Sequence, residues 1–428
     1  MALDNHYHEV IRGLSQRLVE AQRPIRILDA IQWDETIKQD FFARGARQLP
    51  IVTPEYYQQK RPLRFDVETK RRELHEIERD IMRQLGQLNP VGAWLRRQCR
   101  EYLLVVEMLG ARGTAQFSRF SQELYGSSSD VFHAGDPTAA ELASRLQDVL
   151  QQLIQQSPAI SANEKTFTAP EAVKWLNQRL RKQFPGIGVR ARLSDGILAD
   201  AAAGGDTIKL RADASFSERD LRVLESHEGW VHIGTSLNGS QQPVCTFLAK
   251  GPPSATVTQE GLAVMTETLS MHSTPHRLSR LTRRVQAVAL VEDGADFLEL
   301  YRYLLNAGEN PDDAWQLSAR VFRGSHPDNG PFTKDLSYIK GFVLAYNYVR
   351  LAIARGTPER IHLLFCGKTT IDDMKTITEL VAEGAILPPH YLPPLFEDLT
   401  GLSACLSFTR FASALDFSQL ERDYSPVF

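Results

Sequence analysis

The sequence is poor in cysteine and has no long hydrophobic run. Its four cysteines are scattered over 428 residues and form no C-x-x-C pair. This spacing excludes a cysteine-ligated zinc ribbon and fits the reduced thiols of a cytosolic protein. No stretch approaches the ~18 consecutive apolar residues of a membrane-spanning helix, and no apolar run follows a basic start at the N-terminus. We therefore expect a cytoplasmic protein without a membrane segment.

An excess of charge of one sign is also missing. The formal net charge is -3 at pH 7, so global electrostatics indicate neither a nucleic-acid partner nor a membrane surface. The sequence contains no Walker A loop, no G-x-G-x-x-G after a predicted strand and no G-x-S-x-G nucleophile elbow. With these motifs missing, metal-dependent chemistry is considered next. The sequence does not indicate the oligomeric state.

One short segment contains the side chains of a hydrolytic metal site. His227, Glu228 and His232 lie in SHEGWVHIGT, and Glu260 follows in QEGLA. Catalytic zinc commonly has three protein ligands, His/His/Glu among them, and keeps its fourth position for water. A carboxylate next to a ligand can accept the proton of that water. Buried histidines without a metal are the competing interpretation.

The spacing of the two histidines departs from the common H-E-x-x-H motif, in which they are four residues apart. At ~100° per residue, positions i and i+5 lie ~140° apart on a regular α-helix, too far around for both imidazoles to reach one ion. A single wide turn of the π-bulge type would bring His227 and His232 together, and Gly229 would crowd that turn least. The pattern is either a coincidence or a helix with a built-in irregularity.

HExxxH followed by QEGLA resembles the QEGLA-motif family. Bacterial members are named flavohaemoglobin expression-modulating QEGLA motif proteins, and animal relatives are the microtubule-associated tubulin tyrosine carboxypeptidases. Three further segments are similar to the bacterial branch: NPVGAWLRRQCREY at 89–102, LRADASFSERDLRVLESHEGWVHIGT at 210–235 and FRGSHPDNGPFTKDLSYIKGF at 322–342. The resemblance runs through most of the chain, and the two motifs together are fairly specific.

The resemblance implies a role for each motif residue. His227, His232 and Glu260 would bind one Zn²⁺ per chain, and Glu228 would be the catalytic base. Glu267 lies on the same helical face as Glu260, but ~10 Å further along the axis. It competes with Glu260 as a ligand, or it orients a ligand histidine from behind.

Other residues near the motifs have open roles. Gln259 either hydrogen-bonds near the metal or is structural. A carboxypeptidase needs a cation for the terminal carboxylate of its substrate, and Arg323, Lys334 and Tyr338 are the candidate substrate-binding residues. The Tyr338 hydroxyl would donate to the oxyanion. Alternatively, Lys334 caps a helix start and Tyr338 packs at the edge of the core.

The hydrophobic patterning predicts an α+β protein that is mostly helical. Apolar residues at helical spacing mark 67–85 and 138–155, and 277–306 reads as one continuous helix. We expect a helical N-terminal region at 1–160 and a zinc-metallopeptidase-like catalytic domain at 161–428, together forming one compact unit.

A small antiparallel sheet is predicted directly before the HExxxH helix. Three short segments at 189–193, 197–201 and 207–212 alternate or favour β-branched residues, and Asp-Gly and Gly-Gly turns separate them. Ser217 with Asp220 is a plausible N-cap arrangement for the helix that follows. Many zinc proteases place such a sheet before the zinc helix.

The resemblance implies a zinc-dependent metallopeptidase. The expected reaction is that of a carboxypeptidase, which removes a C-terminal residue, tyrosine or another aromatic one, from a peptide or protein tail. Two other interpretations stay open. One is a non-catalytic zinc-binding regulatory protein, and the other is an amidase that acts on a small molecule.

Overall fold

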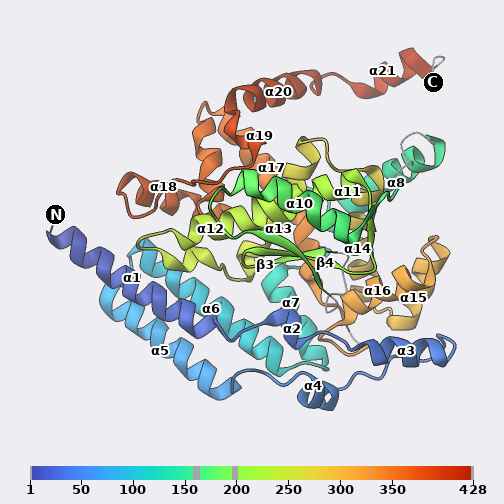
Figure 1. The fold of residues 1–428 in the computed structure, drawn as a ribbon, viewed down its shortest axis with the longest axis horizontal. Coiled ribbons are helices and arrows are strands. Elements are labelled where there is room, and N and C mark those ends of the chain that lie inside the picture. The colour runs from blue at the N-terminus through green and yellow to red at the C-terminus, as the bar shows by residue number, and fades with distance from the viewer. Residues whose placement is uncertain (1, 158–163, 195–200, 329, 426–428) are drawn as a thin grey trace.

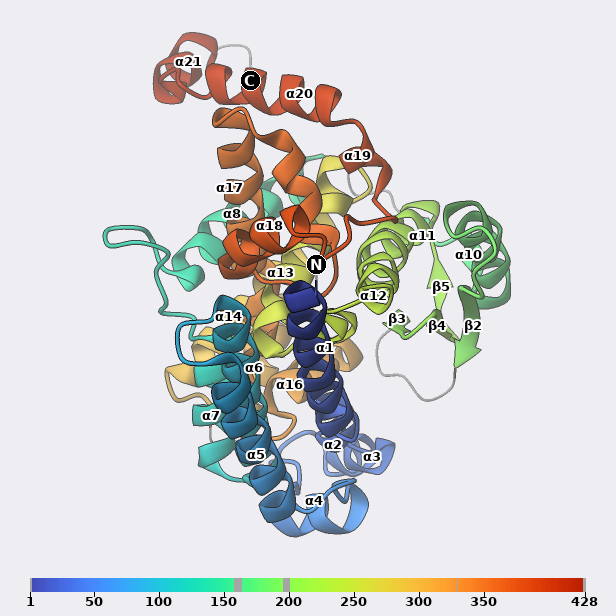
Figure 2. The same ribbon diagram turned by 90° about the vertical axis from the view of Figure 1, so that its left-hand side faces the viewer.

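The computed structural model describes residues 2–157, 164–194, 201–328 and 330–425, which are mostly helical with two small sheets (Figure 1). The N-terminal helices are α1 (Ala2–Gln22), α2 (Ile27–Ala30), α3 (Glu35–Ala43), α4 (Pro54–Lys60), α5 (Val67–Leu85), α6 (Pro90–Gly110), α7 (Ala115–Tyr125) and α8 (Ala139–Gln156). Helices α1, α5 and α6 lie side by side (Figures 1 and 2). Leu74, Ile77 and Ile81 of α5 are buried at helical spacing, as the pattern at 67–85 predicts.

The middle of the chain contains both sheets and the histidine motif. Its elements are β1 (Phe167–Thr168), α10 (Ala169–Gln183), β2 (Arg190–Ser194), β3 (Ala201–Gly204), β4 (Thr207–Arg211), β5 (Ser215–Phe216), α11 (Glu218–Leu224), the π-helix η1 (Glu225–Ile233) and α12 (Gly234–Ser240). Both β3 and β4 contact η1, and α10 packs against β2 and η1. The sheet therefore supports the histidine-bearing helix from one side (Figure 2).

The predicted antiparallel sheet is only partly correct. Strand order is β2-β4-β3, with β3 antiparallel to β4 but β2 parallel to β4. The segment expected at 197–201 lies outside the described residues except for its last residue. Two consecutive hairpins would place β3 in the centre of the sheet. The observed order instead places β4 there, with a hydrogen-bonded strand on each edge, and its Ile208 and Leu210 are completely buried. The separate pair of β1 and β5 is antiparallel.

The C-terminal half is helical. Its elements are η2 (Thr246–Ala249), α13 (Pro253–Leu269), α14 (Pro275–Glu292), α15 (Phe297–Asn306), α16 (Pro311–Phe322), η3 (Thr333–Leu336), α17 (Ser337–Ala354), η4 (Pro358–Phe365), η5 (Ile371–Asp373), α18 (Met374–Ala382), α19 (Pro394–Glu397), α20 (Leu399–Ala412) and α21 (Phe417–Tyr424). The helix predicted at 277–306 is broken in two. Gly294 has a φ of +106°, and Asp296 then caps the next helix by accepting from the Glu299 amide.

Helix α13 runs through the middle of the molecule and is buried along every residue from Thr258 to Glu267. It crosses α17 at a point where only glycine fits. A Cβ on Gly261 would lie 2.0 Å from the carbonyl carbon of Gly341, and one on Gly341 would lie 1.9 Å from the carbonyl oxygen of Val257. This close approach places the start of α17, and η3 before it, beside Glu260.

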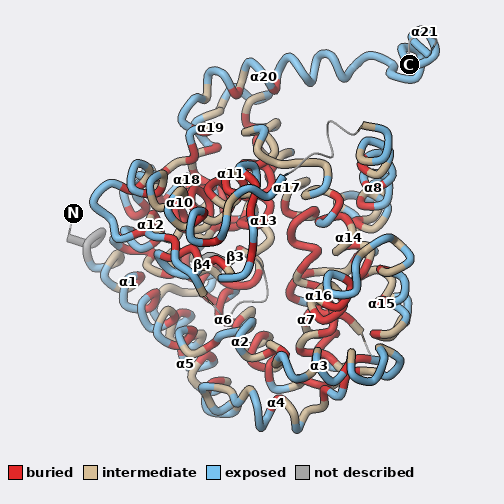
Figure 3. The backbone as a smooth tube through the Cα atoms, turned by 45° about the vertical axis from the view of Figure 1, so that its right-hand side comes forward, coloured by how far each residue is buried: buried red, intermediate tan, exposed pale blue. Residues whose placement is uncertain are grey.

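Buried residues concentrate around α13, and exposed ones lie at the periphery (Figure 3). The largest apolar cluster takes side chains from α1, α5 and α6 as well as from η1, α13 and α17. Helices α20 and α21 extend away from the body, and α21 buries no residue. Among the described helices, none is both long and apolar enough to span a membrane.

Candidate metal centre

The two motif histidines lie on a π-helix. Ser217 caps α11 in a capping box with Asp220, as predicted, and the chain continues from α11 into η1 without leaving helical geometry. In a π-helix the i→i+5 hydrogen bond stacks each residue over the fifth one before it. His227 and His232 therefore share one face of η1, as the predicted wide turn requires. Their ring centroids are 4.8 Å apart.

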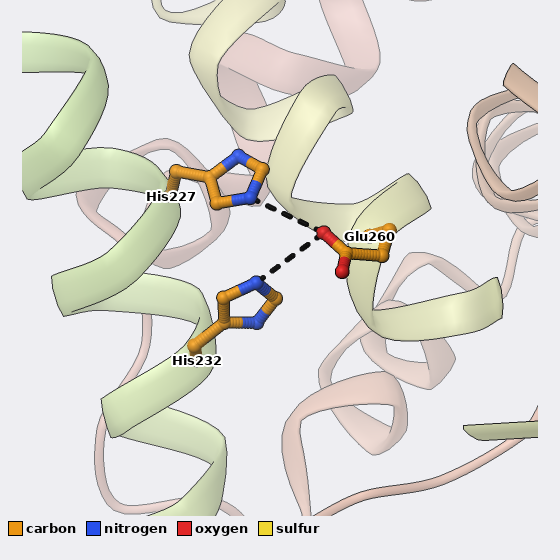
Figure 4. A group of neighbouring side chains, drawn as sticks. All are labelled: His227, His232 and Glu260. Atoms are coloured by element: carbon orange, nitrogen blue, oxygen red, sulfur yellow. Dashed lines mark ion pairs between the residues drawn. The ribbon is translucent and has the colours of Figure 1, made fainter. Parts of the chain in front are cut away.

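Glu260 of α13 points at both imidazoles (Figure 4). Its Oε2 atom lies 3.3 Å from Nε2 of His227 and 3.5 Å from Nε2 of His232. Each residue offers one potential ligand atom, and these atoms all lie within 4.8 Å of one another. The three predicted ligands thus form one buried cluster that could hold a metal ion.

Burial and charge set the electrostatics of this cluster. Burial acts to lower the pKa of His227, but the carboxylates of Glu260 and Glu267 overcome it and raise that pKa to about 10. Burial acts to raise the pKa of Glu260, yet Lys334 and the two histidines hold it well below its ordinary value. Glu260 is therefore a carboxylate, and its buried Oε2 accepts no hydrogen bond from the described residues.

Glu267 lies behind His227, on the side away from Glu260. Its Oε2 is 3.8 Å from Nδ1 of His227, which is longer than a hydrogen bond, and its Oε1 is 3.4 Å from Nε of Arg277. Glu267 is fully buried. The geometry places Glu260, and not Glu267, among the cluster of possible ligands.

Two of the three predicted substrate-binding residues contact the cluster itself. Nζ of Lys334 lies 2.9 Å from Oε1 of Glu260, so this amine pairs with one of the predicted metal-binding residues. The ring of Tyr338 lies 6.3 Å from the His227 ring and nearly parallel to it. The hydroxyl of Tyr338 accepts from Nη2 of Arg320 at 3.3 Å.

A group of arginines adjoins Tyr338, and two of its members, Arg284 and Arg320, were not predicted from the sequence. Arg320 forms a two-pronged ion pair with Asp335, and Arg284 lies 5.0 Å from the Tyr338 ring centroid. Arg323 lies against Phe332 instead, at 5.5 Å from that ring. Basic residues in α14 and α16 are indistinguishable in the sequence from those of a solvated helix face, so only the fold identifies them.

Among the described residues, neither Arg284 nor Arg323 forms a direct ion pair with a carboxylate, although the charge of Asp335 acts on both. The buried Nε of Arg323 also has no hydrogen-bond acceptor there. Burial, followed by the charge of Arg320, lowers the pKa of both guanidinium groups to about 10. This part of the site therefore has a local excess of positive charge.

Glu228 and Lys368 complete the surroundings of the cluster. Glu228 is half-buried, and its charge acts to raise the pKa of His227, Arg277 and Lys368, so it lies in the same electrostatic environment. Lys368, which was not predicted, donates to the backbone oxygen of His232 at 2.9 Å. Burial lowers the pKa of Lys368 to about 7.

A comparison with known families agrees with the motif. A family model described as microtubule-associated tyrosine carboxypeptidase matches residues 39–414. The chain belongs to this family. The match confirms the predicted relationship, includes every site residue named above and crosses the predicted boundary between 1–160 and 161–428. A search of curated proteins found no match.

Proposed function

We propose that this member of the carboxypeptidase family is a zinc-dependent metallopeptidase that removes a C-terminal residue from a peptide or protein tail. The observation that carries the proposal is the convergence of Glu260 on His227 and His232. In a domain with two histidines five residues apart, this arrangement needs both the π-helix and the opposing helix α13.

The residues fit zinc in type, and all three ligand atoms lie within 4.8 Å of one another. Zinc ligand atoms lie ~2.0–2.2 Å from the ion, and at a tetrahedral angle two of them are about 3.4 Å apart. The separations of 3.3 Å and 3.5 Å between Glu260 and the two imidazoles are close to this value. The buried Oε2 of Glu260 also lacks a hydrogen-bond donor among the described residues, and a cation would satisfy it. Zinc, when bound, polarises a carbonyl and makes water more acidic.

Glu228 is the proposed general base. It takes one proton from the attacking water, whose oxygen adds to the scissile carbonyl carbon. It then delivers that proton to the leaving nitrogen as the C–N bond breaks, which yields a shortened chain with a new carboxyl group and a free amino acid. The position of Glu228 next to His227 and its partial exposure support this role. Tyr338 remains a proposed oxyanion donor.

Arg284 and Arg323 are the proposed recognition groups for the terminal carboxylate. Among the described residues neither guanidinium forms a direct ion pair with a carboxylate, which favours an incoming anion, and guanidinium groups bind carboxylates through paired hydrogen bonds. The guanidinium group of Arg284 lies over the Tyr338 ring, and this ring lies beside His227 of the metal centre. The carboxylate of a C-terminal residue lies only about one residue length, ~3.8 Å, beyond the scissile bond. Lys334, which was expected to bind the substrate carboxylate, pairs with Glu260 instead.

The family description names tyrosine as the residue released and microtubules as the associated structure. For this chain we propose the more general substrate, a protein or peptide tail that ends in an aromatic residue. A cytoplasmic location is part of the proposal and is supported by the four cysteines, all of them free thiols.

Metal content and turnover test the proposal together. Purified protein should contain one zinc per chain, and His232→Ala should lose it. Glu228→Gln should keep zinc and lower kcat by about 10²- to 10⁴-fold, the usual contribution of a general base. The matched control is Glu218→Gln, an exposed glutamate paired with Arg222 on the preceding helix. Full turnover by Glu228→Gln would end the proposed mechanism.

Peptides with matched ends separate the open alternatives. A peptide that ends in Tyr with a free carboxylate should be cleaved, and the same peptide with a C-terminal amide should be a poor substrate. Equal cleavage of both would exclude carboxylate recognition and favour an amidase or endopeptidase. Bound zinc without cleavage of any member of a peptide library would favour the regulatory interpretation.

A further inference from the structure

Lys368 lies where the segments that carry the three predicted ligands meet. Its Nζ donates to the backbone oxygen of His232 at 2.9 Å, to Oε1 of Gln259 at 2.8 Å and to Oγ1 of Thr235 at 3.0 Å. The first acceptor belongs to a predicted ligand, and the second belongs to the residue directly before Glu260. One amine thus joins the π-helix η1 to helix α13.

The chemistry of these contacts is well matched. In its protonated form the Lys368 amine has three N–H donors, and three acceptors lie at hydrogen-bonding distance. Hydrogen bonds from the protonated amine are stronger than those between neutral groups. Gln259, whose role the sequence left open, takes part in these contacts as an acceptor. The Gln259 carbonyl oxygen also lies 2.8 Å from the Thr235 hydroxyl, so the contacts form a closed network.

The segment that carries Lys368 is itself fixed. The backbone N–H of Lys368 donates to the carbonyl oxygen of Leu248 at 2.8 Å. A Cβ on the neighbouring Gly367 would lie 2.7 Å from the Leu248 backbone oxygen and from its Cβ, so the turn at 366–370 packs tightly on η2. The lysine therefore reaches the metal centre from a rigid support.

The surroundings of the two histidines differ. Glu267 lies behind the imidazole of His227, with its Oε2 3.8 Å from Nδ1. In the part of the chain that the structure describes, no carboxylate lies behind His232 in this way, but its backbone oxygen accepts from Lys368 and from Ser236. We infer that Lys368 is a positioning residue, which sets His232 and Glu260 at the separation that a shared metal ion requires. The inference rests on the proposed function, because it presupposes that these residues bind zinc.

The test compares zinc binding with folding in Lys368→Met, which keeps an unbranched apolar side chain of nearly the same length and removes the donors. Zinc affinity is measured by competition with a chromogenic chelator, and the absorption spectrum of the Co²⁺-substituted protein reports ligand geometry. We expect a loss of about 10- to 100-fold in zinc affinity, the range found for outer-shell partners of metal ligands, and a changed Co²⁺ spectrum. Lys368→Arg, which retains a cationic donor, should recover part of the affinity.

Lys70→Met is the matched control. Lys70 is also buried and donates to a backbone oxygen, that of Ala21, at 2.9 Å, but it lies on α5 in the N-terminal region. It should destabilise the zinc-free protein at least as much as Lys368→Met does, with unchanged zinc affinity and Co²⁺ spectrum. Wild-type zinc affinity and spectrum in Lys368→Met would overturn the inference.

Two further outcomes are separable. If Lys368→Met does not fold, Gln259→Leu removes the acceptor on α13 and should weaken zinc binding in the same direction, and wild-type affinity in that variant would overturn the inference. Failure of the wild-type chain to bind zinc would overturn the proposed function, and this inference with it. Zinc binding that is equally tight in wild type and Lys368→Met would leave the proposed function intact and remove only the role of Lys368.

Discussion

Lys334 and Glu260 form a buried ion pair at the centre of the molecule, with Nζ 2.9 Å from Oε1. The pair occupies one carboxylate oxygen and leaves the other facing the two imidazoles. Lysine and the proposed zinc ion therefore share one carboxylate, each on its own oxygen. Because both cations neutralise the same carboxylate, the loss of unfolding free energy on removing the lysine should depend on whether zinc is bound.

Lys334→Met should destabilise the zinc-free protein more than the zinc-bound protein. Without the lysine, Glu260 is a buried charge that lacks its cation, and breaking a buried pair typically costs about 3–5 kcal/mol. Zinc would neutralise the same carboxylate, so the loss should shrink when the metal is present. Denaturant unfolding with chelator and with zinc measures both values. Lys334→Arg, which keeps the charge, is the control, and equal losses in the two conditions would contradict the shared carboxylate.

Glu267→Gln should weaken zinc binding without changing the ligand set. The substitution keeps the size of the side chain but removes the charge behind Nδ1 of His227, and such changes cost about 10- to 100-fold in metal affinity. Glu292→Gln is the control. Glu292 also accepts hydrogen bonds, from the amide and the hydroxyl of Ser128. It is the last residue of α14, whereas Arg277, the partner of Glu267, is near the start of that helix. Chelator competition on both variants decides the matter, and the same affinity in both would remove Glu267 from the site.

The metal cluster could be predicted because its chemistry is concentrated in two short motifs. His227 and His232 stand at an unusual spacing beside Glu228 and ahead of Glu260, and that spacing also predicts the wide turn that η1 provides. The helices at 67–85 and 138–155 could also be predicted from the sequence, since their apolar residues repeat at helical spacing.

The rest of the site depends on contacts between distant segments. Lys368 lies 108 residues after Glu260 in the sequence, and its local pattern is that of an ordinary loop lysine. Arg284 and Arg320 sit on amphipathic helices whose basic residues face solvent in most proteins. The parallel pairing of β2 with β4 likewise depends on tertiary packing, because local alternation indicates a strand but not its neighbour.

Gly261→Ala should destabilise the fold by about 1–3 kcal/mol or more, the usual cost of overpacking. The added methyl group would meet the Gly341 backbone at 2.0 Å, and backbone atoms cannot move aside as a side chain does. The separation of α13 from α17 should also displace Glu260 and weaken zinc binding. Gly13→Ala is the control, because its Cβ would meet no atom within 4 Å in helix α1. It should stabilise by about 0.5–1 kcal/mol, and a similar gain in Gly261→Ala would refute the close approach.

Asp335 should make the stability of the protein depend on acid pH. Burial acts to raise the pKa of Asp335, but Arg320 and Arg284 hold it well below its ordinary value. Because the folded-state pKa is depressed, the contribution of this carboxylate to stability is present above the unfolded pKa of ~3.9. It is lost as pH falls below that value towards the folded-state pKa.

Asp335→Asn should therefore cost about 3–5 kcal/mol at pH 7, where it leaves Arg320 without its partner. The difference from wild type should narrow below pH ~4. Unfolding free energies between pH 7 and pH 3 measure this, with the exposed Asp213→Asn as the control, and a difference that stays constant down to pH 3 would contradict the depressed pKa.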